Sequence, residues 1–201
     1  MIQCSALLFL LTFFVHTASS AETKISGIIP GGAGYEIRLI AYSDYISYSE
    51  VLLDRTFLDS TDCFSLQADI TETRDVYLDM DFYSTTLYLE PEKDYHLHFD
   101  PILMAYQYRP FYEKEPFVFR IDSVDQNELN NLIFEFNEIY NDFLTVNFQN
   151  IYNRRIKSLI ETFRSEMNDK YAGIENQYFK SFIEFKIASA ELSAKGSNEP
   201  Q

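Results

Sequence analysis

The sequence predicts an α+β protein in which an antiparallel β-sandwich of about seven strands precedes a C-terminal helical segment. Three observations support this fold class. Short runs of alternating apolar and polar residues follow one another at intervals of roughly 8–12 residues in the first part of the chain. Turn-forming residues separate these runs, as in Pro-Gly-Gly-Ala-Gly at 30–34. Beyond about Ser123 the apolar residues instead recur at helical spacing.

Residues 1–21 have the pattern of a secretory signal peptide. The apolar block at 6–15 is too short to span a bilayer, which takes about 20 residues. Small residues follow at 18–21, in the order expected of a cleavage site, although no Lys or Arg precedes the block. We therefore expect export to the periplasm or cell envelope and cleavage after Ser20 or Ala21. We expect no integral membrane segment in the mature chain.

Residues 22–122 are expected to form the β-sandwich domain. Period-2 alternation is clear at 35–42, where Ile37, Leu39 and Ala41 share one face. Residues 100–116 are expected to be a loop that contains Tyr and Pro. Residues 117–121 are an additional candidate for a short strand. The expected strands are 24–29, 35–42, 51–58, 63–70, 76–82, 85–89 and 95–99.

Residues 123–201 are expected to form the helical segment. Asp125 and Glu128 have the spacing of a capping box, in which a side chain at each position satisfies the first backbone N–H groups of a helix. Three asparagines between 147 and 153 mark a break, and Gly173 ends the helix that follows it. The expected helices are 129–144, 156–167 and 177–194.

Composition excludes several classes of function. The chain has 16 Lys and Arg against 31 Asp and Glu, so its net charge is −15. Nucleic acid is not an expected partner, because binding a duplex requires a basic surface. The two cysteines, Cys4 and Cys63, exclude a Cys-based zinc cluster, a CxxC pair and a disulfide framework. We expect a structural role for Cys63, no enzymatic activity and no cofactor.

Two groups of residues are candidates for metal or acid chemistry. His96 and His98 lie two apart on a predicted strand, so both point to one face, and Asp100 offers a third ligand for a transition metal. Asp79 and Asp81 form another same-face pair, and paired carboxylates serve glycoside hydrolysis when a second one lies across a cleft. For both groups the favoured interpretation is a solvated strand face opposite the core. A metal-dependent enzyme is thus the third hypothesis.

Tyr106, Tyr108 and Tyr112 are the candidate ligand-binding residues. They lie in the predicted loop, and loops on a rigid scaffold often carry function. Tyrosine combines an apolar ring with a polar tip and suits glycans or peptides. A glycan- or peptide-binding module is therefore an alternative function. Packing within the β domain is the simpler explanation for the other tyrosines.

The last expected helix is apolar over more than one stripe. A surface helix needs an apolar arc of only about 100°. Phe185 and Ile187 lie outside the arc that Phe179, Phe182 and Ile183 define. We therefore expect a protein partner or self-association through Phe182, Phe185 and Ile187, unless the β domain folds back to cover this helix.

Several stretches together resemble a known family. They are ISGIIPGGAGYEIRLIAY, LLDRTFLDSTDCFSLQADI, LYLEPEKDYHLHFD and YFKSFIEFKIASAELS. Their order is similar to the N-terminal module of exported bacterial thiol–disulfide oxidoreductases, where a β-sandwich-like domain of unknown function and a helical segment precede a thioredoxin domain. The resemblance covers most of residues 24–193 as a pattern of strands and turns. No CxxC motif occurs in this sequence, so no catalytic residue is carried over. The resemblance implies a non-catalytic accessory role in the cell envelope.

Overall fold

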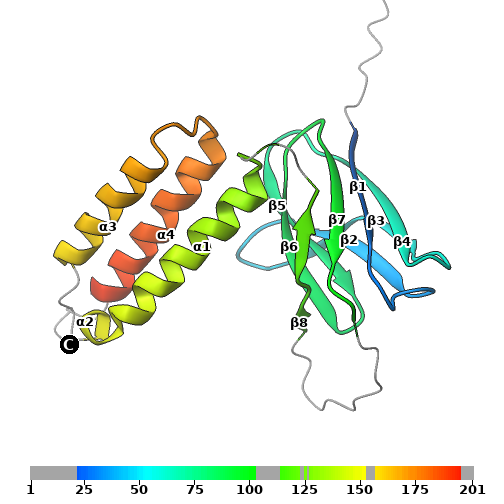
Figure 1. Ribbon diagram of the computed structural model, residues 1–201, viewed down its shortest axis with the longest axis horizontal. Coiled ribbons are helices and arrows are strands. Elements are labelled where there is room, and N and C mark those ends of the chain that lie inside the picture. Colours follow the sequence, from blue (N-terminus) through cyan, green and yellow to red (C-terminus); the bar gives the residue numbers. More distant parts are fainter. Residues whose placement is uncertain (1–21, 103–113, 123–124, 126, 153–156, 196–201) are drawn as a thin grey trace, which may run out of the picture.

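The computed structural model describes residues 22–102, 114–122, 125, 127–152 and 157–195. Strands form a two-layered sandwich, and helices pack beside one end of it (Figure 1). The predicted α+β class, a sandwich followed by a helical segment, is confirmed. The expected signal segment 1–21 lies outside the described residues, as do Tyr106, Tyr108 and Tyr112.

The described strands form one sheet in the order β4-β1-β7-β9 and another in the order β3-β2-β5-β6-β8. Most neighbours are antiparallel, but β1–β7 and β6–β8 are parallel. In the first sheet, β1 lies between β4 and β7, strands that come much later in the chain, and it is antiparallel to β4 but parallel to β7. The strands are β1 (Glu22–Ile28), β2 (Glu36–Tyr42), β3 (Glu50–Phe57), β4 (Cys63–Asp69), β5 (Arg74–Met80), β6 (Tyr83–Leu89), β7 (Asp94–Phe99), β8 (Glu115–Pro116) and β9 (Phe119–Ile121).

Alternating residues of the strands fill the core between the sheets. On β7, Tyr95, Leu97 and Phe99 are buried while the residues between them are exposed. Gly27 of β1 lies where the sheet and its core leave no room for a side chain. A Cβ atom there would come within 2.6 Å of the Leu97 carbonyl oxygen and 2.8 Å of the Phe64 ring. The strand therefore depends on glycine at this point of close approach.

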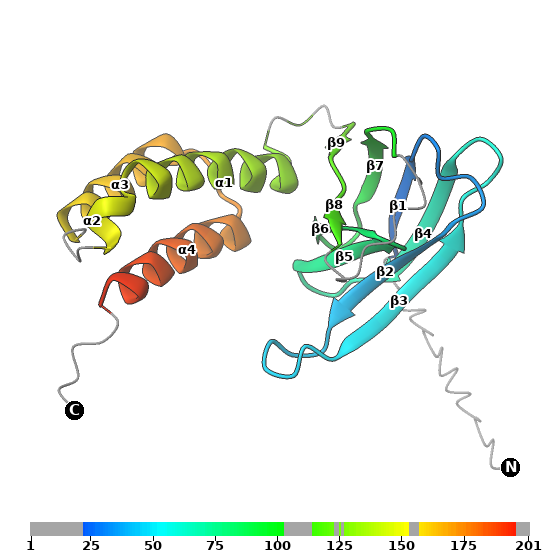
Figure 2. The ribbon, with the colours of Figure 1, turned by 90° about the horizontal axis from the view of Figure 1, so that it is seen from below.

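The helices form a second core beside the sandwich (Figure 2). Phe136 of α1 lies at its centre, among aromatic rings of α1, α3 and α4. Within the described ranges, no helix combines the length and the apolar character needed to cross a membrane. The helices are α1 (Leu129–Val146), α2 (Phe148–Tyr152), α3 (Lys157–Lys170) and α4 (Gln177–Lys195).

The first helix starts differently from the expected capping box. Glu128 is itself the N-cap, and its carboxylate accepts a hydrogen bond from the Asn131 backbone N–H at 2.8 Å. Asp125 instead accepts from the Asn127 backbone N–H at 2.9 Å, one turn before the helix. Glu128 takes the capping role because its side chain is buried against the sandwich, where Asn130 also binds it.

Candidate interaction surface at the sandwich–helix junction

The β2–β3 hairpin projects from the sandwich on the side of the helices (Figures 1 and 2). Asp44 holds its loop together. One carboxylate oxygen accepts hydrogen bonds from the Ile46 and Ser47 backbone N–H groups at 2.8 and 2.7 Å. The other accepts from the Ser47 hydroxyl at 2.6 Å. These bonds fix a loop that exposes Ile46 to 93% of its full surface and Tyr45 to 62%.

The conformation of this loop is expected to depend on pH. The hydroxyl and backbone N–H of Ser47 lower the pKa of Asp44 from 3.8 to about 2. Because the folded pKa is depressed, the loop is stabilised at pH values above 3.8, and that stabilisation is lost as the pH falls toward 2. We expect the amide resonances of Ile46 and Ser47 to titrate with a midpoint near pH 2 in an NMR pH series. A midpoint at or above 3.8 would contradict the assigned contacts, and Asp44→Ala should abolish the transition.

The backbone of Tyr48 has an unfavourable conformation. Its φ is +51°, in the left-handed region that bulky residues seldom adopt. The Tyr48 ring meets the Tyr42 ring edge to face, with centroids 5.4 Å apart. Strained residues of this kind concentrate at ligand clamps and switches. The strained backbone of Tyr48 therefore favours a functional role for this residue and for the ring that it contacts.

Asp75 is half-buried on the outer face of the five-stranded sheet, on the same face as Tyr42 and Tyr77. The hydroxyls of Tyr45 and Tyr77 both donate to this carboxylate, the latter at 3.2 Å. Tyr88 lies directly across the strand pair from Asp75, and its ring contacts Tyr178 of α4. We call the group the tyrosine cluster: Tyr42, Tyr45, Tyr48, Tyr77, Tyr88 and Tyr178 with Asp75.

Four phenols of the tyrosine cluster, those of Tyr45, Tyr77, Tyr88 and Tyr178, are held in their neutral form. Burial, reinforced by the Asp75 charge, raises the pKa of Tyr45 and of Tyr88 to about 12 and also raises the pKa of Tyr77 and Tyr178. Sequence reasoning assigned the tyrosines of the β domain to packing and missed the cluster, because its members lie on β2, the hairpin loop, β5, β6 and α4. The available signal was the same-face placement of Tyr42 on β2 and of Asp75 and Tyr77 on β5.

Hydrogen bonds hold the helical segment to this part of the sandwich. The Asn130 amide of α1 accepts from the Tyr88 backbone N–H at 2.7 Å and donates to the Tyr88 carbonyl at 2.9 Å, as a neighbouring strand would. Asn176, ahead of α4, donates to Glu90 at 3.1 Å and accepts from the Phe179 backbone N–H at 3.1 Å. The position of Tyr178 relative to the sandwich is therefore fixed.

Only half of the edge strand β3 is open. Asp54 accepts hydrogen bonds from the backbone N–H groups of Arg55 on β3 and Gln67 on β4, both at 2.8 Å. This carboxylate joins the edges of the two sheets and protects that half of β3. In the first half, Val51 and Leu52 are exposed, and within the described residues β3 pairs with β2 alone. The hairpin patch is thus Tyr45, Ile46, Tyr48, Val51 and Leu52.

The candidate metal ligands point outward from β7. His96 lies 2.6 Å from the Ser26 hydroxyl through Nδ1, and His98 Nε2 lies 3.6 Å from the Asp122 carboxylate. Asp100 follows the strand and is exposed. In the part of the chain that the structure describes, no three His, Cys, Asp or Glu side chains come close enough to hold a metal ion. The structure thus does not bring the three candidates together.

The prediction that Asp79 and Asp81 share a solvated face is wrong. The Asp79 side chain is 2% exposed and forms ion pairs with Arg38 and Lys114. Asp81 lies in the turn after β5, with a φ of +49°. Asp79 is buried because these two cations offset the cost of removing its charge from water. The lone described thiol, Cys63, is half-buried at the start of β4.

The last helix is covered more completely than the sequence suggests. Ile187 is 1% exposed in the helical core, so it is not available to a partner. Phe182 is half-buried, with its ring 5.7 Å from Tyr88 of the sandwich and 6.0 Å from Phe136. Phe185 is 69% exposed. Self-association through Phe185 stays a prediction, which light scattering of a Phe185→Glu variant would test.

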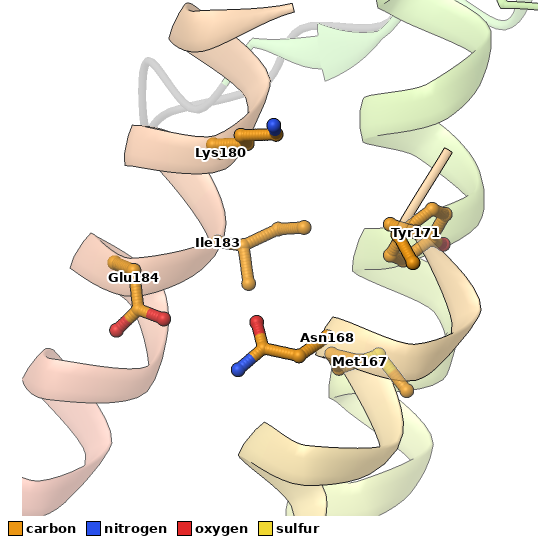
Figure 3. Close-up of a pocket in the computed structure, with 7 residues that line it drawn as sticks. Met167, Asn168, Tyr171, Lys180, Ile183 and Glu184 are labelled. Carbon is orange, nitrogen blue, oxygen red and sulfur yellow. The ribbon is translucent and has the colours of Figure 1, made fainter. Parts of the chain in front are cut away.

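A shallow pocket of about 370 Å³ lies between α3 and α4 (Figure 3). Asn168 and Ile183 point into the space between the helices, and the Tyr171 hydroxyl points away from it. Glu184 at its rim is held by Arg164 at 3.4 Å. This lining contains no nucleophile with a neighbouring base. It consists of Met167, Asn168, Tyr171, Ala172, Lys180, Ile183 and Glu184.

No family model matches the chain, and no curated protein matches it. The chain has a weak likeness to an NMR structure of a protein from Eubacterium rectale, with a TM-score of 0.27 and 14% identity. That match covers 52% of this chain and 94% of the other. At this score the likeness supports no functional inference.

Proposed function

We propose that this chain is a non-catalytic interaction module of the cell envelope that binds a protein through the hairpin patch. The observation that carries the proposal is the hairpin patch itself, which continues along the open half of an edge strand. An exposed apolar residue forgoes about 1.5–3 kcal/mol of burial. Contiguous exposed apolar residues are typical of protein–protein surfaces.

The open half of β3 suggests how a partner would bind. An extended segment can add to a sheet edge by backbone hydrogen bonds, while pockets between side chains give specificity. Asp54 blocks such pairing beyond Leu53, so the pairing segment is short. Leu52 and Ile46 would then supply the apolar contacts beside it. The sequence resemblance to oxidoreductase N-terminal modules supports the same accessory role.

Site-specific photocrosslinking tests the binding surface. We expect a photoreactive residue in place of Ile46 to give one discrete protein adduct in cells that express the chain natively. A Leu52→Asp change should reduce this adduct several-fold, because a charge would be buried at the contact. The same photoreactive residue at Ser65, exposed on the other sheet, is the control. Equal adducts from both positions, or none from 46, would refute the proposed surface.

The proposed location rests on the signal-like segment at 1–21. We expect the chain purified from its native host to begin at Ala21 or Glu22, because signal peptidase would remove the preceding residues. N-terminal sequencing measures this directly. A chain that begins at Met1 would contradict export.

A further inference from the structure

We propose that the tyrosine cluster binds a cationic side chain, lysine or arginine, of the protein partner, between the exposed rings of Tyr45 and Tyr48 and the carboxylate of Asp75. This inference rests on the proposed function, since it names the chemistry of the partner that meets the hairpin patch. Tyr45 and Tyr48 belong to both the patch and the cluster. A partner strand on β3 would therefore lie beside the cluster.

The arrangement of the rings suits a compact cation better than a sugar. The Tyr42 ring stands at 87° to Tyr48 and at 54° to Tyr77, with centroids 5.4 and 4.8 Å apart. A sugar stacks on one flat, open ring face, and these inclined rings do not provide a shared plane. A cation gains from ring faces that turn toward one point, as in the aromatic cages that bind ammonium groups.

The charge at the centre of the cluster points to the same ligand. The hydroxyls of Tyr45 and Tyr77 are neutral donors to Asp75, so they add no positive charge beside its carboxylate. Arg74 directs its guanidinium to the Tyr42 carbonyl oxygen at 3.0 Å. Among the described residues, no lysine or arginine forms an ion pair with Asp75. The net charge of −15 would also attract a basic partner.

Access to Asp75 comes from the solvent side of the hairpin. Tyr45 and Tyr48 are 62% and 60% exposed, so a side chain from solvent can reach both rings. Tyr48 is held there in a strained backbone conformation. Tyr88, which lies across the strand pair from Asp75, contacts Tyr178 at the junction with α4. The site thus requires both the sandwich and the helical segment.

An NMR titration of the purified chain with ring-labelled tyrosine tests the inference. The probes are Nα-acetyl-lysine methylamide and its arginine equivalent, with the norleucine equivalent and a neutral disaccharide as controls. We expect both cationic probes to shift the Tyr45 and Tyr48 ring signals in a saturable manner, and the controls to leave them unchanged. Asp75→Asn should weaken binding about tenfold, because it removes the central charge. Asp81→Asn has the same net charge and should bind as the unmodified chain does.

A second variant tests the inference independently if Asp75→Asn fails to fold. Tyr48→Gly removes one ring at a position where glycine adopts the observed φ without strain, and it should weaken the lysine probe several-fold. Equal response to norleucine, or response to the disaccharide alone, would overturn the inference. If no probe shifts the tyrosine signals while the photoreactive residue at position 46 still forms its adduct, the cation inference is overturned and the proposed function stands. Loss of that adduct would refute the proposed function instead.

Discussion

Replacing Phe136 with alanine is expected to lower the free energy of unfolding of the helical segment by about 4 kcal/mol. Phe136 is fully buried. Its ring centroid lies 5.8 Å from that of Tyr140, 6.5 Å from Phe163, 6.4 Å from Phe179 and 6.0 Å from Phe182. Truncation would remove the transfer free energy of the ring and leave a cavity that three helices cannot close without moving. Phe136→Ala therefore combines the lost burial of the ring with the free-energy cost of the cavity.

Chemical denaturation followed by the helical circular dichroism signal measures this effect. Phe148→Ala is the matched control, because Phe148 has the same side chain in the helical segment but is 63% exposed. It should change stability by less than about 0.5 kcal/mol. A cost below about 2 kcal/mol at Phe136 would show that the helical core is loosely packed. The sandwich has a separate core, so its tertiary signals should change less than the helical signal.

Local periodicity was sufficient to predict most of the strands and helices. On β7 the alternation of Tyr95, Leu97 and Phe99 with polar residues matches the burial in the structure, because a strand with one face on the core repeats every two residues. Helical spacing likewise located α1, α3 and α4. These elements are determined by residues close together in the sequence, which a single sequence displays directly.

Features that depend on distant residues could not be predicted in this way. Asp79 has the pattern of a solvated strand position, and its burial depends on Arg38 and Lys114, which are 41 and 35 positions away. The sequence predicts a second chain at Ile187, because it does not show that this residue enters the core formed by α1, α3 and α4. The tyrosine cluster assembles from β2, the hairpin, β5, β6 and α4, so no local pattern marks it.

Replacing Asn130 with leucine is expected to destabilise the junction by about 3 kcal/mol. Asn130 is fully buried, and its amide satisfies both the backbone N–H and the carbonyl of Tyr88. It also donates to Glu128 at 2.7 Å, so it steadies the N-cap of α1. Leucine has a similar volume but offers no hydrogen bond. The backbone N–H and carbonyl of Tyr88 and one carboxylate oxygen of Glu128 would each lose a hydrogen-bond partner in a site with little access to water.

The loss at Asn130 should extend to the tyrosine cluster, because Asn130 attaches the helical segment to β6 beside Tyr88. Once this attachment weakens, Tyr178 no longer keeps its ring 6.0 Å from that of Tyr88. We therefore expect Asn130→Leu to shift the ring resonances of Tyr88 and Tyr178, whereas the buried rings within the helical core keep theirs. Asn131→Leu, at the exposed neighbouring position, should leave both stability and ring shifts nearly unchanged. If Asn130→Leu were as stable as the unmodified chain, the junction would be held by apolar contacts alone, and the amide bridge would have no part in positioning the cluster.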